Sequence, residues 1–516
     1  MPKQMARLAL LAILLGGWGL YLWGIVRDLP YEPFIDEPIF VERAVHMAAT
    51  GELNPGWFGN PGSTTIYPLA AIYYFWFAVT EGGNLLRPNP RLAADFAADF
   101  SIYYLIGRLL TVAYGLLTVA VTFVLGRKMG GTAVGLLVSL SLIFYPTLAW
   151  HTTVVRSDTS AMFFVALALW FCYQMTDEPR LRHFILAGSA IGLALSSRYL
   201  MIPVYFVYLT LFLLHLPRWR QNGQCALVFR GFLIGGLVSV AVFALSSPFF
   251  FLDWNTAWQN LLMEARSTHL GADGKNYWER AVWYLTSAIP ESIYGAQVIA
   301  LLVGIGWAVY QRKRHLLVLA VFLLIYVAAI SIPTLHWKRW TIQISPILAL
   351  LAAYGIDTTA AALGERLAPL RRMAIALLLG AVVLVQPVYT TARVVIQLGA
   401  TSTRIEARLW IEENLPAGSR IIGEMYTAPL QKTSFVVTTQ PFLPERPFAD
   451  YLSGAFDYVM TSSEISNRFV ANPERYALQL AFYAQLSELP LVQEFVPNPW
   501  QGGPSIRIFR LPKGQE

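Results

Sequence analysis

Two adjacent carboxylates, Asp36 and Glu37, follow the first hydrophobic segment of the chain in the stretch YEPFIDEPIFVERAVHMAATGEL. Pro33 and Pro38 stand on either side of Asp36 and restrict the backbone, so a rigid turn can aim this carboxylate back at the preceding segment. A general base works when it is held within hydrogen-bond reach of the proton that it removes. The alternative is a solvated acidic loop, since residues 27–65 hold six acids and two bases. The rigid turn favours Asp36 as a candidate base.

A second candidate group lies in HTTVVRSDTSAMFF, where Asp158 begins a predicted helix two residues after Arg156. An Asp at a helix start is often an N-cap or a charge favoured by the helix dipole, and Ser157 is a second candidate cap. The functional interpretation is that Asp158 meets Asp36 across the mouth of a helix bundle. The sequence leaves both interpretations open.

A basic pair, Lys338 and Arg339, lies between Trp337 and Trp340 in TLHWKRWTIQISPILALLAAYGI. The structural interpretation is a pair of flanking side chains that snorkel from an aromatic belt at a membrane surface. The functional interpretation is a site for a lipid phosphate, which Arg binds with two hydrogen bonds and Lys binds as a point charge. Arg198, which stands between two short apolar segments, is a further candidate for this task.

A fourth polar region is the loop LMEARSTHLGADGKNYWERAVWYL, which carries Glu264, Arg266, His269, Asp273 and Trp278. A loop of mixed polar residues with glycines is typical of an ordinary protein surface, and it is also typical of a lid over a site. No metal-ligand spacing stands out in it. His269 is the residue of this loop that we predict to bind substrate.

The elements that must position these residues are membrane helices. The chain of 516 residues is 56% hydrophobic and 13% charged, with a mean hydropathy of +0.50, whereas soluble domains carry about 25% charged residues. The net charge of +7 does not imply a nucleic-acid partner, because membrane proteins collect Lys and Arg in cytoplasmic loops. Cys172 and Cys225 lie in an apolar run and a basic loop, so no disulfide framework is expected. The chain is predicted to be an integral membrane protein.

About 20 apolar residues span a bilayer. The first such segment has a basic start but no cleavage site, which indicates a retained helix. Eleven segments qualify, and the pair at 183 and 199 is the least distinct of them. They begin at about residues 7, 101, 131, 158, 183, 199, 229, 290, 315, 341 and 371. Residues 66–80 are also apolar, but this stretch is short and aromatic, which favours a juxtamembrane helix lying in the interface.

The positive-inside rule then orients the chain. If residues 66–80 do not cross, 15 Lys and Arg residues face the cytoplasm with the N-terminus. They are Lys3, Arg7, Arg127, Lys128, Arg180, Arg182, Arg218, Arg220, Arg230, Arg312, Lys313, Arg314, Arg366, Arg371 and Arg372. The candidate residues above then lie on the outer side of the cell membrane (inner or plasma membrane), in residues 27–100, 151–158, 251–289 and 336–340. The apolar interiors are nearly free of charge, Arg108 being the main exception.

The end of the chain has the composition of a soluble domain. We therefore predict a transmembrane domain over residues 1–397 and a small extracytoplasmic α/β domain over residues 398–516. Its first helix, TSTRIEARLWIEEN, is expected to place Leu409 and Trp410 on its apolar face. Strands are predicted from Arg420, in FDYVMTSS and in SIRIFRLP, with a helix over residues 473–489.

Taken together, these motifs resemble polytopic glycosyltransferases of the GT-C fold that use lipid-linked sugars, especially bacterial members of the protein-mannosyltransferase and aminoarabinose-transferase type. The resemblance covers nearly the whole chain. It is carried by the Asp-Glu pair, Tyr67 and Pro68 in the juxtamembrane segment, the Arg-x-Asp at Arg156, the basic residues before a Ser-Pro helix, and RIEARLWIEENLPAGSRI. The chain departs from the family in TTIYPLA, where paired prolines are frequent, and at Ser157, where Pro is frequent.

The resemblance implies a polyprenyl-phosphate-linked sugar donor and transfer with inversion, on the outer side of the membrane, to a lipid, glycan or protein hydroxyl. Asp36 would deprotonate the acceptor, and Asp158 would position the acceptor or assist the base. Lys338 and Arg339 would bind the leaving lipid phosphate, with Arg156 and Arg198 also binding substrate. Glu37 would be a supporting or substrate-binding residue.

No cofactor is expected, although a divalent cation between Asp36 and Asp158 is possible. Two other functions compete with sugar transfer. A transporter or flippase would place ionisable groups near the bilayer midplane, whereas the acids here lie at one face. A non-catalytic binder of lipid-linked sugars in envelope polysaccharide assembly would retain Asp158 and Lys338 without Asp36, whereas all three are present.

Overall fold

The computed structural model describes residues 3–81, 88–264, 273–364 and 369–512. The chain divides into two compact units. The helical unit comprises Met1–Leu22 and Ile35–Ala392, and the α/β unit comprises Trp23–Phe34 and Arg393–Glu516. The segment Trp23–Phe34, which lies between the first helix and the Asp36 turn, therefore packs with the C-terminal residues.

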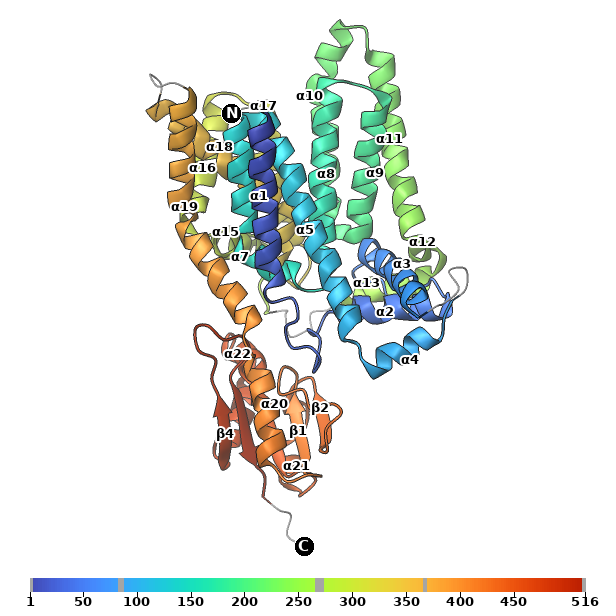
Figure 1. Ribbon diagram of the computed structural model, residues 1–516, viewed down its shortest axis with the longest axis vertical. Coiled ribbons are helices and arrows are strands. Elements are labelled where there is room, and N and C mark those ends of the chain that lie inside the picture. Colours follow the sequence, from blue (N-terminus) through green and yellow to red (C-terminus); the bar gives the residue numbers. More distant parts are fainter. Residues whose placement is uncertain (1–2, 82–87, 265–272, 365–368, 513–516) are drawn as a thin grey trace. The chain divides into compact units, whose positions relative to one another are not determined.

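The helical unit is a bundle of long apolar helices (Figure 1). Within the described ranges, seven helices are long and apolar enough to cross a membrane, and two bent pairs raise that number to nine. α9 and α17 are shorter apolar helices. The apolar helices of the bundle, long and short, are α1 (Lys3–Leu22), α5 (Ser101–Gly130), α6 (Thr132–Ile143), α8 (Ser157–Asp177), α9 (Leu181–Ser197), α10 (Val204–Gln221), α11 (Cys225–Ser246), α16 (Gly295–Tyr310), α17 (Arg314–Ile330), α18 (Ser345–Leu363) and α19 (Pro369–Gly399).

These helices confirm a polytopic membrane protein, and each of the eleven predicted start positions falls in or beside one of them. Among the described residues, the count reaches nine when each bent pair is one span, and it stops there because α9 and α17 are shorter. α6 meets α7 (Pro146–Thr152) at 63°, and the helical stretch Tyr277–Ile293 meets α16 at 114°. That stretch contains α14 (Tyr277–Trp283), η2 (Tyr284–Ala288) and α15 (Ile289–Ile293). Eleven spans stay a prediction.

Glycines bring several of these helices into close contact. A Cβ added at Gly188 of α9 would overlap the carbonyl of Gly235 on α11. One added at Gly304 of α16 would likewise overlap the carbonyl of Leu351 on α18. Small residues of this kind let helix backbones approach within a membrane, where apolar burial between helices gives little driving force.

Shorter helices carry the loops that hold the candidate site. They are α2 (Pro38–Thr50), α3 (Ser63–Thr80), α4 (Arg91–Ala98), α12 (Pro248–Leu252), α13 (Trp254–Glu264) and the short helices η1 (Tyr199–Met201) and η3 (Lys338–Ile344). Pro38 occupies the first turn of α2, where its missing N–H costs no hydrogen bond. α3 contains the predicted juxtamembrane stretch. In Figure 1, α2, α3 and α7 lie at the end of the helical unit away from the N-terminus.

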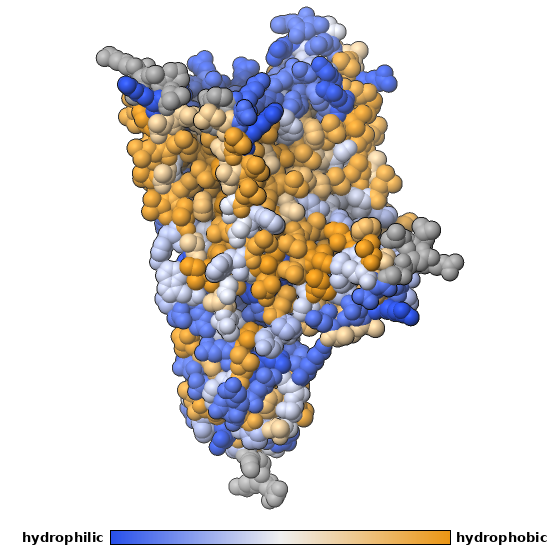
Figure 2. Space-filling model, viewed as in Figure 1, coloured by the Kyte–Doolittle hydropathy of each residue, from blue (hydrophilic) through white to orange (hydrophobic). Residues whose placement is uncertain are grey.

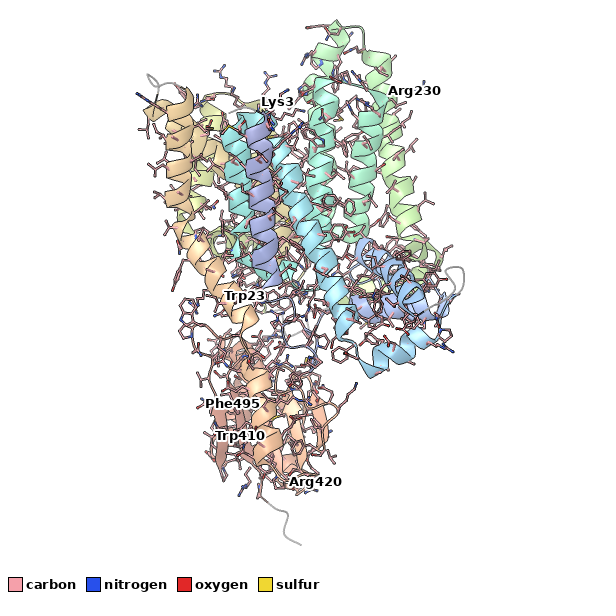
Figure 3. The ribbon with its side chains drawn as sticks, viewed as in Figure 1. Lys3, Trp23, Arg230, Trp410, Arg420 and Phe495 are labelled. Atoms are coloured by element: carbon pink, nitrogen blue, oxygen red, sulfur yellow. The ribbon has the colours of Figure 1, made fainter. Side chains whose placement is uncertain are left out.

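The surface of the helical unit agrees with a bilayer environment. Figure 2 shows a broad belt of apolar residues over its helices and hydrophilic residues at the end that carries the N-terminus. Lys3 and Arg230, which the topology places together in the cytoplasm, lie at the same end of the unit (Figure 3). The side of the membrane that this end faces stays a prediction.

The α/β unit is built on a five-stranded sheet in the order β2-β1-β3-β5-β4. β1 pairs in parallel with β2 and β3, and β5 pairs antiparallel with β3 and β4. The strands are β1 (Arg420–Glu424), β2 (Val436–Gln440), β3 (Tyr458–Ser462), β4 (Leu491–Phe495) and β5 (Ile506–Arg510). The helices are α20 (Thr403–Asn414), α21 (Phe448–Leu452), α22 (Ser463–Val470) and α23 (Ala477–Ser487), and η4 (Leu443–Glu445) is a single turn.

The sheet separates two apolar clusters. One joins α20 to Ile421 and Met460, and the other joins α23 to Ile422 and Val459, as the alternation of side chains along a strand requires. The predicted helices and three predicted strands are present, whereas β2 and β4 were not predicted. Leu409 was wrongly expected on the apolar face of α20, since it is exposed. Trp410 does pack on the core, with its ring 6.2 Å from that of Phe495 (Figure 3).

Candidate active site

Asp36 lies in the turn that leads into α2, and two guanidinium groups from distant parts of the helical unit reach its carboxylate. Its Oδ2 atom accepts hydrogen bonds from Arg156 and from Nη1 of Arg339, the latter at 2.9 Å. The Asp36 side chain is 29% exposed, whereas that of Arg156 is almost fully buried. The carboxylate is thus held on its protein side and open on the other.

Glu37, the next residue, points into the protein. Its two carboxylate oxygens accept from Nε and Nη2 of Arg108 at 2.8 and 2.7 Å, and Oε1 also accepts from the backbone N–H of Val155 at 3.0 Å. Both side chains of this pair are 0% exposed. Glu37 therefore ties the start of α2 to α5 and to the backbone before Arg156. Of the two predicted roles, this geometry fits the supporting one.

Asp158 is buried in the first turn of α8. Its Oδ1 atom accepts from Arg198 and from Nε2 of Gln343, the latter at 2.8 Å. Its side chain is 2% exposed. The N-cap position of α8 is Arg156, without a side-chain cap, and Ser157 donates to Oδ1 of Asn60 at 3.0 Å. The capping interpretation of Asp158 and Ser157 is therefore wrong, and Asp158 is instead the buried centre of an ionic group.

The same two elements, α8 and η3, reach both aspartates, whereas a direct meeting of Asp36 and Asp158 stays a prediction. Arg156 and Asp158 are two residues apart at the start of α8, and Arg339 and Gln343 are four apart on η3. α8 carries Asp158, and its Arg156 donates to Asp36. η3 reaches both aspartates, because Arg339 donates to Asp36 and Gln343 donates to Asp158. His151 adds to the cluster through Nδ1, which lies 3.2 Å from Nη1 of Arg156. The sequence did not identify Gln343, because an amide in an apolar segment has no spacing that signals a partner.

The predicted phosphate-binding pair is divided in the structure. Arg339 faces Asp36, whereas Lys338 is 41% exposed and lies 3.2 Å from Glu291 of α15. Arg198, predicted to share the phosphate site, is buried against Asp158 instead. Lys338 is the most exposed cation of this group.

The loop before α14 is described from Asp273 onward, and the predicted substrate residue His269 and its neighbour Arg266 lie outside the described residues. Asp273 lies 3.3 Å from Nε2 of His336, just before the basic pair. Burial lowers the pKa of His336, and the carboxylate of Asp273 opposes that shift. Arg280 of α14 donates to the carbonyl of Ser331 at 2.9 Å. These contacts join the loop to the segment that precedes η3.

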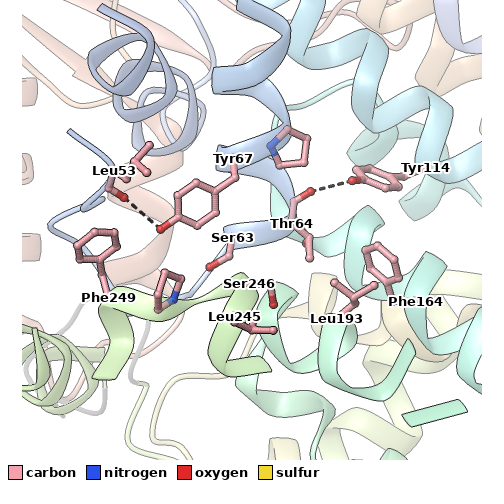
Figure 4. Close-up of a pocket in the computed structure, with 12 residues that line it drawn as sticks. Leu53, Ser63, Thr64, Tyr67, Tyr114, Phe164, Leu193, Leu245, Ser246 and Phe249 are labelled. Carbon is pink, nitrogen blue, oxygen red and sulfur yellow. Dashed lines mark hydrogen bonds between the residues drawn. The ribbon is translucent and has the colours of Figure 1, made fainter. Parts of the chain in front are cut away.

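A cavity of about 410 Å³ opens between α3, α5, α8, α9 and the α11–α12 junction. Leucine, proline and aromatic side chains form most of its wall, and Ser63, Thr64 and Ser246 add hydroxyl groups (Figure 4). Tyr67 donates to the carbonyl of Leu53 at 3.1 Å, and Tyr114 donates to that of Thr64 at 2.7 Å, as the dashed lines of Figure 4 show.

Small hydroxyl groups connect this cavity to the start of α8. Thr64 bonds to Ser197 at 2.6 Å and to Ser160 at 3.0 Å, and Ser160 lies two residues after Asp158. Ser63 bonds to Ser247 at 2.8 Å. These hydroxyl-bearing residues were not predicted from the sequence. The signal available was the run Ser63-Thr64-Thr65 at the head of an otherwise apolar helix.

In the ranges that the structure describes, no group of three or more His, Cys, Asp and Glu side chains could hold a metal ion. The oxygens of Asp36 and Asp158 that accept hydrogen bonds face guanidinium and amide groups, which compete with a cation for the same carboxylates.

Comparisons with known proteins agree with the helical architecture. Residues 103–248 match the family model of dolichyl-phosphate-mannose-protein mannosyltransferases. The structure of ArnT from Cupriavidus metallidurans in the apo state is 13% identical, with a TM-score of 0.52 over 96% of this chain and 97% of that chain. The same protein bound to undecaprenyl phosphate is 14% identical, with a TM-score of 0.49 over 98% of both chains. A search of curated proteins finds no match.

A third solved structure, the oligosaccharyltransferase of Archaeoglobus fulgidus tethered with an acceptor peptide, is 13% identical, with a TM-score of 0.45 over 96% of this chain and 74% of that chain. The likeness to apo ArnT shows the fold, which is the GT-C fold predicted from the sequence. A multi-pass membrane glycosyltransferase that works on lipid-linked sugars is the class of protein that the family match supports.

Proposed function

We propose that this protein transfers a sugar from a polyprenyl-phosphate donor to a hydroxyl group of a lipid, glycan or protein on the outer side of the membrane. One observation carries the proposal. Asp36 is 29% exposed, whereas Glu37 and Asp158 in the same network are almost fully buried. Asp36 is therefore the carboxylate of this group that an incoming hydroxyl can reach.

The reaction assigns one task to Asp36. The acceptor oxygen attacks the anomeric carbon from the face opposite the phosphate, and Asp36 takes the proton of that hydroxyl. The new bond joins the acceptor oxygen to the sugar, and the bond between the sugar and the phosphate oxygen breaks with its electron pair on the phosphate. Polyprenyl phosphate leaves, and the configuration at the anomeric carbon inverts.

The leaving phosphate needs a cation at the membrane edge, because negative charge grows on it as the bond breaks. Lys338 is exposed and Arg339 is 25% exposed beside Asp36, so both can meet an anion. Arg198 is buried with Asp158 and serves the acid instead. The apolar cavity that Thr64 lines has the size and polarity to receive part of a lipid chain. Thr64 also donates to Ser160 of α8.

The first test is loss of the base. In cells that lack the protein, the wild-type chain should restore a glycoconjugate that mass spectrometry detects, and Asp36→Asn should restore none. Asp36→Asn keeps the hydrogen-bonding shape of the side chain but cannot accept the proton. Glu52→Gln in the same loop is the matched control, because Glu52 is 63% exposed and pairs with His46 instead. Full activity of a well-expressed Asp36→Asn protein would exclude Asp36 as the base.

We also propose that transfer requires no bound divalent ion. Washing the purified protein with a chelator should leave its transfer rate unchanged, because guanidinium groups already compensate both aspartates. A rate that disappears with the chelator and returns with Mg²⁺ or Mn²⁺ would contradict this.

The proposed topology has its own test. A reporter fused after Lys128 should give a cytoplasmic signal, since this residue lies in the last turn of α5, at the predicted cytoplasmic loop. A signal from the outer side would mean that residues 66–80 cross the membrane and that the helices after them are inverted.

A further inference from the structure

The segment Trp23–Phe34, which leads to the Asp36 turn, is bound by side chains of α20 in the α/β unit. Arg404 forms an ion pair with Glu32, and its Nε atom also donates to the carbonyl of Thr427 at 3.0 Å. The Arg404 and Glu32 side chains are 14% and 27% exposed. Arg404 thus reaches from α20 to Glu32 while its own orientation is fixed by the backbone of the same unit.

Two further contacts hold the same segment. Ser402, the N-cap of α20, donates to Oδ1 of Asp28 at 2.7 Å. The guanidinium of Arg408 lies 4.8 Å from the ring centre of Tyr31, a cation–π contact. Asp28, Tyr31 and Glu32 are joined locally as well, because the N–H groups of Tyr31 and Glu32 both donate to the carbonyl of Asp28 at 3.0 Å. The segment is therefore a folded part of the α/β unit at three successive points.

The other side of Asp36 is anchored in the helical unit, through the buried pair of Glu37 with Arg108. Between the anchor at Glu32 and the anchor at Glu37 lie four residues, of which Pro33 has a fixed φ. Four residues span at most about 14 Å even when fully extended. A stretch this short can pass a change in the backbone at Glu32 along the chain to Asp36.

We propose that Arg404 is a positioning residue for Asp36, and that the α/β unit sets the orientation of the proposed base by binding Asp28–Glu32. The proposal rests on the proposed role of Asp36. Its physical basis is covalent continuity, since a shift of Glu32 passes through three residues to Asp36. A displacement of about 1 Å in a reacting group can lower the rate of transfer about a hundredfold.

The test replaces the two partners of the ion pair separately and together. Arg404→Gln and Glu32→Gln should each lower kcat about tenfold with little change in KM, since substrate binding does not use the pair. The double variant should be no slower than either single variant, because both changes remove the same contact. Arg404→Lys should recover part of the rate. Arg420→Gln is the matched control, because Arg420 pairs with Asp457 elsewhere in the same unit.

Hydrogen exchange of full-length protein gives a readout that does not need activity. Peptides covering residues 28–37 should exchange faster in Arg404→Gln and Glu32→Gln, while peptides from β1 and β3 stay protected. Faster exchange with an unchanged kcat would overturn the positioning role of Arg404. Unchanged exchange would show that the ion pair of Arg404 with Glu32 does not hold residues 28–37. If the wild-type chain transfers no sugar, the proposed function fails, and the exchange experiment still decides whether the segment is held. If Arg404→Gln fails to fold, Glu32→Gln carries both measurements.

Discussion

Two fully buried glutamates, one in each unit, are compensated in opposite ways. Glu37 at the start of α2 has a guanidinium partner, Arg108, which meets both of its oxygens. Glu424 at the end of β1 has neutral partners. Oε1 accepts from the N–H of Ser462 at 2.7 Å, and Oε2 accepts from the hydroxyl of Tyr483 at 2.5 Å and from the N–H of Leu443 at 3.2 Å.

The neutral surroundings of Glu424 change how this carboxyl group responds to pH. Burial raises the pKa of Glu424 from its ordinary value of 4.5 to about 7, although the three neutral donors oppose the shift. Neutral donors stabilise a buried carboxylate less than a cation does, so this group takes up a proton near neutral pH. The helical unit instead uses arginines beside its acids. Such ion pairs suit the proposed role of Asp36, because the geometry around a base must hold while the base takes up a proton.

The largest expected effect comes from breaking the charged pair. Arg108→Met removes the guanidinium that meets both oxygens of the buried Glu37 and should lower the free energy of unfolding by about 3–5 kcal/mol. The double variant Glu37→Leu with Arg108→Met should recover much of this loss, because it removes both charges. Thermal unfolding in detergent micelles measures the effect. Arg180→Gln, which breaks an exposed pair with Glu178, is the control and should change little.

Recovery of stability in the double variant should not bring back sugar transfer, because the start of α2 loses its tie to α5. An Arg108→Met protein that unfolds at the same temperature as the wild type would contradict the stabilising role of this pair.

The next effect is a pH dependence confined to the α/β unit. Because the folded pKa of Glu424 lies above its unfolded value, its contribution to stability is complete below about pH 4.5 and is lost as the pH rises through about 7. The two pKa values differ by about 2.5, which corresponds to about 3 kcal/mol. Hydrogen exchange of β1 and β3 peptides from the full-length protein measures this loss.

Glu424→Gln should remove that pH dependence, because the amide does not titrate. The ratio of exchange rates between variant and wild type at each pH cancels the intrinsic dependence of exchange on pH. The variant should be the less stable protein in acid, since the amide nitrogen cannot accept from an N–H. The same pH profile in both proteins would show that Glu424 does not titrate in this range.

A smaller effect is expected from Tyr483, whose hydroxyl donates to Glu424. Tyr483→Phe removes one of the donors that lower the pKa of Glu424, so the midpoint of the pH-dependent loss should move upward. The loss of this hydrogen bond should also cost about 1 kcal/mol. Tyr476→Phe is the control, because the rings of Tyr476 and Tyr483 both pack on Phe469. A midpoint that moves downward in Tyr483→Phe would contradict the assignment of the hydroxyl as donor to the carboxylate.

Local patterns in the sequence determined the class of the protein and the starts of its helices. Hydropathy over about 20 residues identifies membrane helices because each must satisfy its backbone hydrogen bonds internally. The position of Asp36 between two prolines, beyond the first such helix, is also visible in the sequence. β2 and β4 were missed because VVTTQ and LVQEF are five residues long and bear polar side chains among their apolar ones.

The partner of each of these charged residues follows from the tertiary structure alone. The partners Glu37 and Arg108 are 71 residues apart, Asp158 and Gln343 are 185 apart, and Glu32 and Arg404 are 372 apart. No periodicity specifies such pairs, because they depend on which helices pack together and at what height. The sequence determined that two acids stand beside a membrane helix. Packing decided that Glu37 is buried with an arginine and that Asp36 remains open for chemistry.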